Sequence, residues 1–202
     1  MWRSRTGGSD KLQLTNSSHA TLPQWSPDGN RIAFVAATWG KPWRIYLVSS
    51  EGGAAQPVVD DTQGEVDPSW SPDGKKLMFG RASSQADAVP LEILVADLAT
   101  HNVEKLPGSE GRFSPRWSPD GRHVAALAAD SRSLWLYDFR SLQWSLWYQV
   151  MEGSIGYPSW SGDSQYLYFG TRMTGHPSEW RIRLGKHTAE MIANLEGEQS
   201  FG

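Results

Sequence analysis

The amino-acid sequence predicts an all-β chain of repeated four-stranded antiparallel units, and three observations support this prediction. The pentapeptide Trp-Ser-Pro-Asp-Gly occurs at residues 25–29, 70–74 and 117–121, and a changed copy, Trp-Ser-Gly-Asp-Ser, occurs at 160–164. Each copy is followed by a short run of alternating apolar residues, which is typical of a β-strand. The tryptophans of the four copies lie 45, 47 and 43 residues apart, a spacing that fits four short strands and no helix. Four antiparallel strands in a period of this length indicate the blade of a β-propeller.

The strands of each repeat can be placed in order along the chain. The first strand ends at the motif tryptophan, and the second begins directly after the turn that follows it. A third strand and, after a glycine-bearing or polar turn, a fourth strand complete the repeat. We expect second strands at 31–35, 76–80, 123–127 and 165–169, third strands at 44–48, 92–96, 133–137 and 180–184, and fourth strands at 55–59, 102–106, 143–150 and 188–195.

The repeated pentapeptide has a structural role in this prediction. Proline fixes φ, aspartate can accept a hydrogen bond from the backbone ahead of it, and glycine adopts a positive φ, so the motif is expected to form a β-turn. Its tryptophan is expected to pack between adjacent blades. The aspartates recur once per blade and do not gather at one place, and we therefore expect no metal site. The positions assigned to this structural repeat are Trp25, Asp28, Gly29, Trp70, Asp73, Gly74, Trp117, Asp120, Gly121, Trp160 and Asp163.

Composition and motifs exclude several classes of function. Lysine and arginine number 19 against 22 for aspartate and glutamate, a net charge of −3, so the chain lacks the basic excess of a segment that contacts nucleic acid. The longest apolar run, residues 124–129, is far shorter than the roughly 20 residues of a membrane helix. The sequence holds no cysteine, no nucleophile elbow, no phosphate-binding loop and no pair of histidines spaced as metal ligands. We expect no enzyme activity, no catalytic residue and no cofactor, and the compartment stays open.

The repeats divide the chain into one half blade and four fuller blades. Residues 1–8 align with residues 46–53 at an offset of 45, so the chain is expected to open in the middle of a blade. The four blades are therefore expected to form an incomplete arc of a larger propeller, whose missing blades the parent chain supplies. The expected layout of this single propeller segment is a half blade at 1–16, blades at 17–61, 62–108, 109–152 and 153–197, and the start of a missing blade at 198–202.

The sequence pattern of the repeat resembles that of a known family. The pattern Pro-x-Trp-Ser-Pro-Asp-Gly, then Ile-Ala-Phe, then Ile-Tyr with a Gly-Gly turn, is similar to the TolB-type, WD-repeat-like propeller repeat over nearly the whole chain. The resemblance implies a binding platform. Such propellers occur in periplasmic envelope proteins, as the non-catalytic domain of prolyl-oligopeptidase-like peptidases, and at the C-terminal end of bacterial winged-helix regulators and serine/threonine kinases. The stretches 41–48 and 106–111 look most like the propellers of the regulators and kinases.

The loops that differ between repeats are the candidates for recognition, because the scaffold of a propeller recurs while its loops vary. One face would gather the loop after the second strand of the first full blade, residues 83–90 of the second blade and residues 171–179 of the fourth. Exposed aromatic residues beside charges suit a protein or peptide partner. Alternatively, the two tryptophans of the first loop cap the outer edge of their own blade. The candidate partner-binding residues are Trp39, Lys41, Trp43, Arg172 and His176.

These observations favour a non-enzymatic propeller that acts as a protein-interaction or sensory module, as part of a larger bacterial signalling or regulatory protein. Two alternatives stay open: a periplasmic envelope binding protein of the TolB kind, and the non-catalytic propeller of a prolyl-oligopeptidase-like serine peptidase.

Overall fold

The structure is a computed structural model in which every regular element of the described residues is a strand. It describes residues 1–16, 19–36, 41–59, 63–81, 90–173 and 176–195, and only the backbone of residues 172, 173 and 176. The strands are β1 (Trp2–Arg3), β2 (Leu12–Gln13), β3 (Ala20–Trp25), β4 (Arg31–Ala36), β5 (Arg44–Ser49), β6 (Gln56–Pro57), β7 (Glu65–Trp70), β8 (Lys76–Arg81), β9 (Ile93–Asp97), β10 (Val103–Lys105), β11 (Arg112–Trp117), β12 (His123–Ala128), β13 (Ser133–Asp138), β14 (Gln143–Gln149), β15 (Ser154–Trp160), β16 (Tyr166–Met173), β17 (His176–Arg183) and β18 (Ala189–Asn194).

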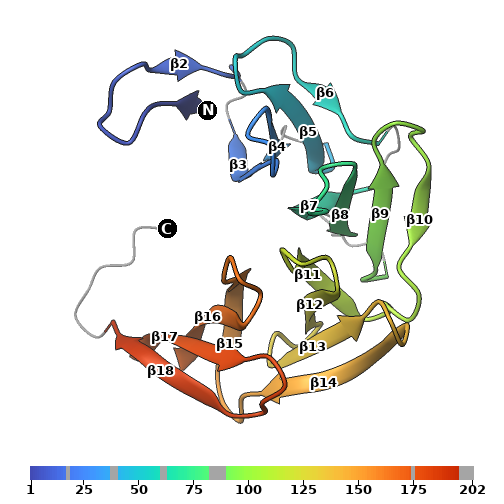
Figure 1. Ribbon diagram of the computed structural model, residues 1–202, viewed down its shortest axis with the longest axis vertical. Coiled ribbons are helices and arrows are strands. Elements are labelled where there is room, and N and C mark those ends of the chain that lie inside the picture. The colour runs from blue at the N-terminus through green and yellow to red at the C-terminus, as the bar shows by residue number, and fades with distance from the viewer. Residues whose placement is uncertain (17–18, 37–40, 60–62, 82–89, 174–175, 196–202) are drawn as a thin grey trace. The chain divides into compact units, whose positions relative to one another are not determined.

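The strands form four four-stranded sheets and one two-stranded sheet (Figure 1). The larger sheets are β3–β6, β7–β10, β11–β14 and β15–β18, and in each of them the strands are neighbours in chain order. The two-stranded sheet is the antiparallel pair β1–β2. The strands of each larger sheet come from one repeat of the sequence. The predicted all-β fold class, with four-stranded antiparallel blades, is confirmed.

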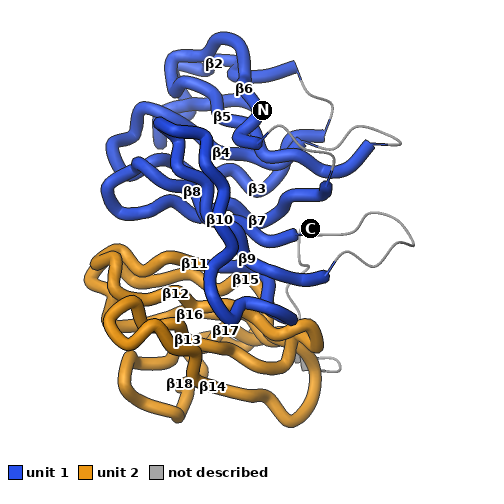
Figure 2. Tube along the Cα trace, turned by 90° about the vertical axis from the view of Figure 1, so that its right-hand side faces the viewer, with its two compact units in different colours: residues 1–115 blue, residues 116–202 orange. Residues whose placement is uncertain are grey.

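The chain divides into two compact units, residues 1–115 and residues 116–202 (Figure 2). The first unit holds β1 to β10, and the second holds β12 to β18. Strand β11 continues from the first unit into the second. Each unit is described by itself below.

The first unit has its main core between the sheets β3–β6 and β7–β10. Phe79, Leu77 and Ile45 are fully buried there, and Trp70 packs among them with 8% of its surface exposed. A smaller apolar cluster joins β1–β2 to the β3–β6 sheet. Its buried members are Leu14, Ile32, Phe34 and Val48, with Met1 and Leu12 packed against them.

In the second unit, aromatic pairs join the sheets β11–β14 and β15–β18. The rings of Trp147 and Trp160 stack with their centroids 5.5 Å apart, and Tyr148 meets Phe169 at the same distance. The indole N–H of Trp147 donates to the carbonyl of Lys186 at 2.8 Å. Aromatic rings thus supply the large buried area between these two sheets, and the polar atom on one of them is satisfied.

Two of the motif tryptophans make the same contact with the sheet that precedes them. The indole N–H of Trp70 donates to the carbonyl of Gln24 at 3.0 Å, and that of Trp160 donates to the carbonyl of Arg116 at 2.9 Å. In both cases the acceptor is the residue directly before the motif tryptophan of the preceding repeat. Trp117 is half-buried, and its indole N–H lies 3.4 Å from the carbonyl of Gly121 in its own turn.

The expectation that every motif tryptophan packs between blades is wrong for Trp25, which is 51% exposed. The sheet before it in the chain, β1–β2, has two strands instead of four. Within the described residues, no strand therefore stands where β3 stands for Trp70. The Trp25 side chain is exposed because the described strands include no first strand of a preceding sheet that would cover it.

The first strand of each repeat contains a backbone feature that the sequence pattern did not predict. The residue three positions before each motif tryptophan has a positive φ although it is not glycine, with values between 51° and 55°. At this point the pairing register shifts in β3, β7 and β15, as a β-bulge requires. A proline follows each of these residues. The four residues are Leu22, Asp67, Ser114 and Tyr157.

The expected loop at residues 171–179 is corrected by the structure. Strands β16 and β17 pair without interruption from Tyr166 and Arg183 to Met173 and His176. The hairpin is therefore longer than the alternation of apolar residues indicated, because backbone pairing continues to Met173 and His176. Both Arg172 and His176 are strand residues at the far end of this hairpin.

The contrast between Trp70 and Trp25 gives a prediction for stability. Trp70→Ala is expected to lower the free energy of unfolding by about 3–5 kcal/mol, as the loss of a buried tryptophan does. Trp25→Ala is expected to lower it by less than about 1 kcal/mol, because the side chain is half exposed. Urea unfolding followed by far-ultraviolet circular dichroism measures both. Equal losses in the two variants would contradict the assignment of Trp70 to the core.

Candidate functional site

The motif turns share one hydrogen-bond pattern, centred on the serine that follows each tryptophan. In the second repeat the Ser71 hydroxyl donates to Asp73 Oδ1 at 2.7 Å and accepts the N–H of Lys76 at 2.9 Å. The Asp73 carboxylate also accepts the N–H of Lys75 at 3.0 Å. The same bonds occur around Ser26, Ser118 and Ser161. Sequence reasoning assigned the aspartate and the glycine, and it missed the part that serine plays in satisfying the backbone.

Glycine takes the positive φ that the turn needs in the first three copies, with values of 72° at Gly29, 68° at Gly74 and 75° at Gly121. In the fourth copy Ser164 takes the equivalent conformation with a φ of 59°. Its hydroxyl accepts the N–H of Asp120 at 3.0 Å, which ties the fourth turn to the third. The changed copy of the motif therefore keeps the turn, and its serine adds a bond that glycine could not make.

The motif aspartates titrate below the ordinary range for this residue. The hydrogen bond from the serine hydroxyl, followed by a bond from a backbone N–H, lowers the pKa of Asp28, Asp73 and Asp163. For Asp120, partial burial by itself would raise the pKa, but the hydrogen bonds from Ser118 and from the Arg122 N–H outweigh it, and the pKa is lowered. Each carboxylate thus accepts hydrogen bonds from within its own turn.

A second group of aspartates, Asp97 and Asp138, lies at the turn between the third and fourth strands of two repeats. Backbone N–H groups of Thr100 and Ala99 lower the pKa of Asp97, and the N–H of Arg140 lowers the pKa of Asp138.

The described residues contain no group of three or more histidine, aspartate or glutamate side chains that could hold a metal ion. No helix long and apolar enough to cross a membrane occurs among them.

The lowered pKa values predict how stability depends on pH. Between the folded pKa and the ordinary value of about 3.9, the unfolded chain binds more protons than the folded chain, so stability rises with pH. The contribution is fully present above about pH 4 and is lost as the pH falls through the folded pKa. The urea midpoint of the wild-type chain is expected to drop below pH 4.

Asp73→Asn tests this dependence at one turn. The variant is expected to be less stable than the wild type at pH 7, and the difference should shrink as the pH falls below about 3.9, because the aspartate of the unfolded chain then binds a proton before the folded Asp73, whose pKa is lowered, does. Ser71→Ala removes the largest cause of the lowered pKa and should weaken the pH dependence in the same way. A difference that is as large at pH 3 as at pH 7 would show that the carboxylate charge does not stabilise the turn.

Among the candidate partner-binding residues, Trp43 is the one whose surroundings the structure describes best. Its side chain is 44% exposed, directly before β5, and Lys41 is exposed two residues earlier. The carbonyl of Trp43 accepts the N–H of Glu65 at 2.8 Å, so the backbone at Trp43 is held by the first strand of the next sheet. An exposed indole therefore stands on a fixed backbone.

A buried ionic cluster lies directly beneath this point. Glu65 is fully buried, its Oε2 accepts the N–H of Ile45 at 2.9 Å, and its Oε1 lies 3.6 Å from Arg44 Nε. Arg44 Nη2 also donates to the carbonyl of Val59. The cross-strand partner of Glu65 is Arg81, which is buried and lies over the ring of Phe79. A buried carboxylate needs this compensation, so the cluster ties β5, β7 and β8 together at the end of the sheets where Trp43 is exposed.

The other candidates cannot be assembled into one site from the described residues. Trp39 lies outside them, and so does most of the 83–90 loop. Arg172 and His176 are placed by their backbones only, in the second unit, whereas Lys41 and Trp43 belong to the first. The structure therefore supports a candidate surface at Lys41 and Trp43, and the shared face proposed for all five residues stays a prediction.

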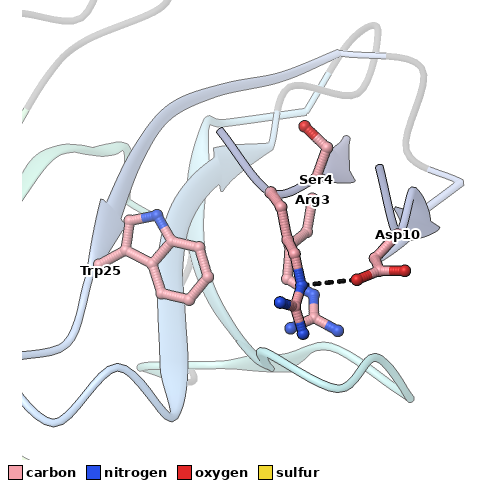
Figure 3. A pocket seen from close by; sticks show the side chains of 5 residues that line it. Arg3, Ser4, Asp10 and Trp25 are labelled. Atoms are coloured by element: carbon pink, nitrogen blue, oxygen red, sulfur yellow. Dashed lines mark ion pairs between the residues drawn. The ribbon is translucent and has the colours of Figure 1, made fainter. Parts of the chain in front are cut away.

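A pocket that sequence reasoning missed lies at the N-terminal hairpin (Figure 3). It has a volume of about 260 Å³ and is lined by Arg3, Ser4, Arg5, Asp10 and Trp25. Arg5 Nε lies 2.5 Å from Asp10 Oδ2, and Arg3 Nη1 lies 3.2 Å from Glu51 Oε1. The signal that could have pointed to it is the half blade predicted at residues 1–16, since a sheet of two strands before Trp25 covers less of that side chain than a sheet of four.

Comparison with known proteins defines the class of fold. No protein-family model matches the sequence. A TolB-type protein from Agrobacterium tumefaciens superposes with a TM-score of 0.77 at 18% identity, over 94% of this chain and 71% of that one. TolB from Acinetobacter baumannii superposes with a TM-score of 0.76 at 22% identity, over 93% of this chain and 47% of that one. The chain has the β-propeller fold, and this fold is similar to that of the two TolB-type structures.

Two further matches involve peptidases. A prolyl endopeptidase superposes with a TM-score of 0.61 at 16% identity, over 86% of this chain and 29% of that one. In sequence, the uncharacterized peptidase YuxL of Bacillus subtilis (strain 168) is 36% identical over 61 residues, which are 30% of this chain and 9% of that protein. The chain thus matches less than a third of the length of either peptidase, and the similarity to the solved structures concerns the fold.

Proposed function

We propose that this propeller is a non-enzymatic protein-interaction or sensory module within a larger bacterial signalling or regulatory protein. The observation that carries the proposal is Trp43, a large aromatic side chain that is exposed while its backbone is fixed from the neighbouring sheet. Tryptophan is enriched among the residues that dominate binding energy, and a fixed backbone reduces the entropy lost on association. Lys41 adds a charge beside it. A protein or peptide partner suits this surface.

The choice of parent protein rests on residues 41–48 and 106–111, whose sequence resembles that of the propellers of winged-helix regulators and kinases. The peptidase alternative is supported by the match to YuxL and by the fold of the prolyl endopeptidase. The envelope alternative is supported by the two TolB-type structures. The first two parents differ from the third in the effector domain that such a protein carries beside its propeller.

The residues encoded on either side of the sequence distinguish these parents. Sequencing the gene in both directions is expected to reveal a winged-helix or kinase domain joined to the propeller. A hydrolase domain with a Gly-x-Ser-x-Gly elbow would overturn the proposal in favour of a peptidase, and a secretion signal directly before the propeller would overturn it in favour of an envelope protein.

Trp43→Ala tests the proposed surface. The variant is expected to weaken the affinity for the protein partner tenfold or more, equivalent to about 1.4 kcal/mol, because an exposed tryptophan is a typical anchor of an interface. Its urea midpoint should stay that of the wild type. Tyr157→Ala, a change at an exposed aromatic residue in the other unit, serves as the control. Unchanged affinity in Trp43→Ala would remove this surface from consideration.

The chain is also expected to have no hydrolytic activity of its own. Purified protein should cleave neither a prolyl p-nitroanilide peptide nor p-nitrophenyl acetate above the background rate, because no nucleophile elbow occurs in the sequence. Release of p-nitroaniline or p-nitrophenol is followed by absorbance. Turnover that disappears in a single Ser→Ala variant would contradict the assignment.

A further inference from the structure

One buried residue of the neighbouring sheet contacts three consecutive residues at the exposed tryptophan. The Glu65 N–H donates to the carbonyl of Trp43 at 2.8 Å, and Glu65 Oε2 accepts the N–H of Ile45 at 2.9 Å. Glu65 Oε1 lies 3.6 Å from Nε of Arg44, the residue between these two. Glutamate is among the residues least often found fully buried, yet this side chain has no exposed surface. Because burial of a carboxylate is costly, its charge points to a role that a neutral side chain does not fill.

The next sheet makes the same two backbone contacts without a carboxylate. There the Gly111 N–H donates to the carbonyl of Leu91 at 2.8 Å, and the Ile93 N–H donates to the hydroxyl of Ser109 at 3.1 Å. By strand pairing, the two bonded positions are those that Glu65 binds one repeat earlier. A buried neutral serine is thus enough to hold the start of a third strand. The negative charge of Glu65 must therefore serve its charged neighbours.

Two arginines accompany this carboxylate. Arg44 lies within ion-pair distance and also donates to the carbonyl of Val59, so its guanidinium is held at two points. Arg81 is the cross-strand partner of Glu65, and it is buried over the ring of Phe79. A buried ion pair adds little stability compared with apolar residues of the same volume, because desolvation offsets the attraction. Its best-attested use is the selection of one conformation.

We propose that Glu65 is the positioning residue of the surface at Lys41 and Trp43. Its buried charge selects the conformation of residues 43–45 in which the indole of Trp43 is exposed on a fixed backbone. The inference rests on the function proposed above, since a fixed anchor loses less entropy when a partner binds. Its experiment uses the free chain without a partner, so its outcome is independent of the affinity measured for Trp43→Ala. Glu65 acts through Arg44 and the backbone, and it contacts no partner itself.

Glu65→Gln isolates the charge, because the glutamine side-chain oxygen can still accept the Ile45 N–H. Nuclear magnetic resonance relaxation of the backbone and indole nitrogens measures the order parameter of each N–H group in the free 202-residue chain. In the wild type, the Trp43 backbone N–H is expected to have an order parameter of about 0.85, the value of a rigid strand. In Glu65→Gln it is expected to fall below about 0.6, while that of Trp70 stays unchanged. Trp43→Phe identifies the Trp43 indole peak.

A triple variant separates positioning from stability. Glu65→Gln combined with Arg44→Met and Arg81→Met removes the three charges and keeps an acceptor for the strand. Its urea midpoint is expected to stay near that of the wild type, because none of these three buried charges is left without its partner. The order parameter of Trp43 is nevertheless expected to fall as in the single variant. Ser109→Ala is the matched control, since it removes the equivalent acceptor in the next sheet and should leave Trp43 rigid.

A Trp43 that stays rigid in the triple variant would overturn the proposal, whether or not Glu65→Gln folds. A mobile Trp43 in the wild type would overturn it as well, because no fixed conformation would then exist. If order is lost equally at Trp70, or if the urea midpoint of the triple variant falls with it, Glu65 stabilises the fold and does not position the surface. Local loss of order at Trp43 with an unchanged midpoint supports the proposal.

Discussion

At Trp70 and Trp160, the hydrogen bond from the motif indole to a carbonyl of the preceding sheet is the contact on which the packing of the two sheets depends. Tryptophan brings the largest buried area of any side chain, yet its N–H must be satisfied when it is buried. Trp70 meets both requirements at once, with its ring in the core and its N–H on Gln24. Arg31 stacks over the same ring at 5.0 Å and donates to the carbonyl of Gly74 at 2.8 Å, so the contact is reinforced from the sheet that precedes it.

The turn after each tryptophan and the bulge before it hold the first strand in place. The serine hydroxyl and the aspartate carboxylate satisfy the backbone where the chain reverses, and the bulge interrupts pairing three residues before the tryptophan. A short regular segment is left between them, which carries the tryptophan. Local hydrogen bonds therefore hold the strand that carries the indole, and the different exposure of Trp70 and Trp25 goes with the different sheets that precede them.

The repeat made the fold predictable from sequence, whereas the functional surfaces depend on contacts between repeats. Four strands per period and the role of the Pro-Asp-Gly turn follow from local patterns, which is why these expectations could be formed without coordinates. The exposure of Trp25 could not be read in this way, because its motif is identical to that of Trp70 and only the neighbouring sheet differs. The burial of Glu65 could not be predicted from the sequence either, since a carboxylate at the start of a strand is normally a surface residue.

The long hairpin of β16 and β17 illustrates a related limit. Apolar alternation reports burial, and backbone pairing extends beyond it to Met173 and His176. Strand ends are thus less predictable than strand centres, and recognition residues are often at the ends. The pocket at Arg3 and Trp25 joins residues from the first hairpin and from the end of β3, a proximity that no spacing in the sequence indicates.

The left-handed residues before the prolines restrict which substitutions the chain can accept over evolutionary time. Valine, isoleucine and threonine are the usual residues of a strand, but their branched side chains are strongly disfavoured at positive φ. At positions 22, 67, 114 and 157 the chain has leucine, aspartate, serine and tyrosine, none of them branched at Cβ. The first strand of every repeat therefore contains one position where the ordinary preference of a strand is reversed, and substitution there is restricted to glycine and unbranched side chains.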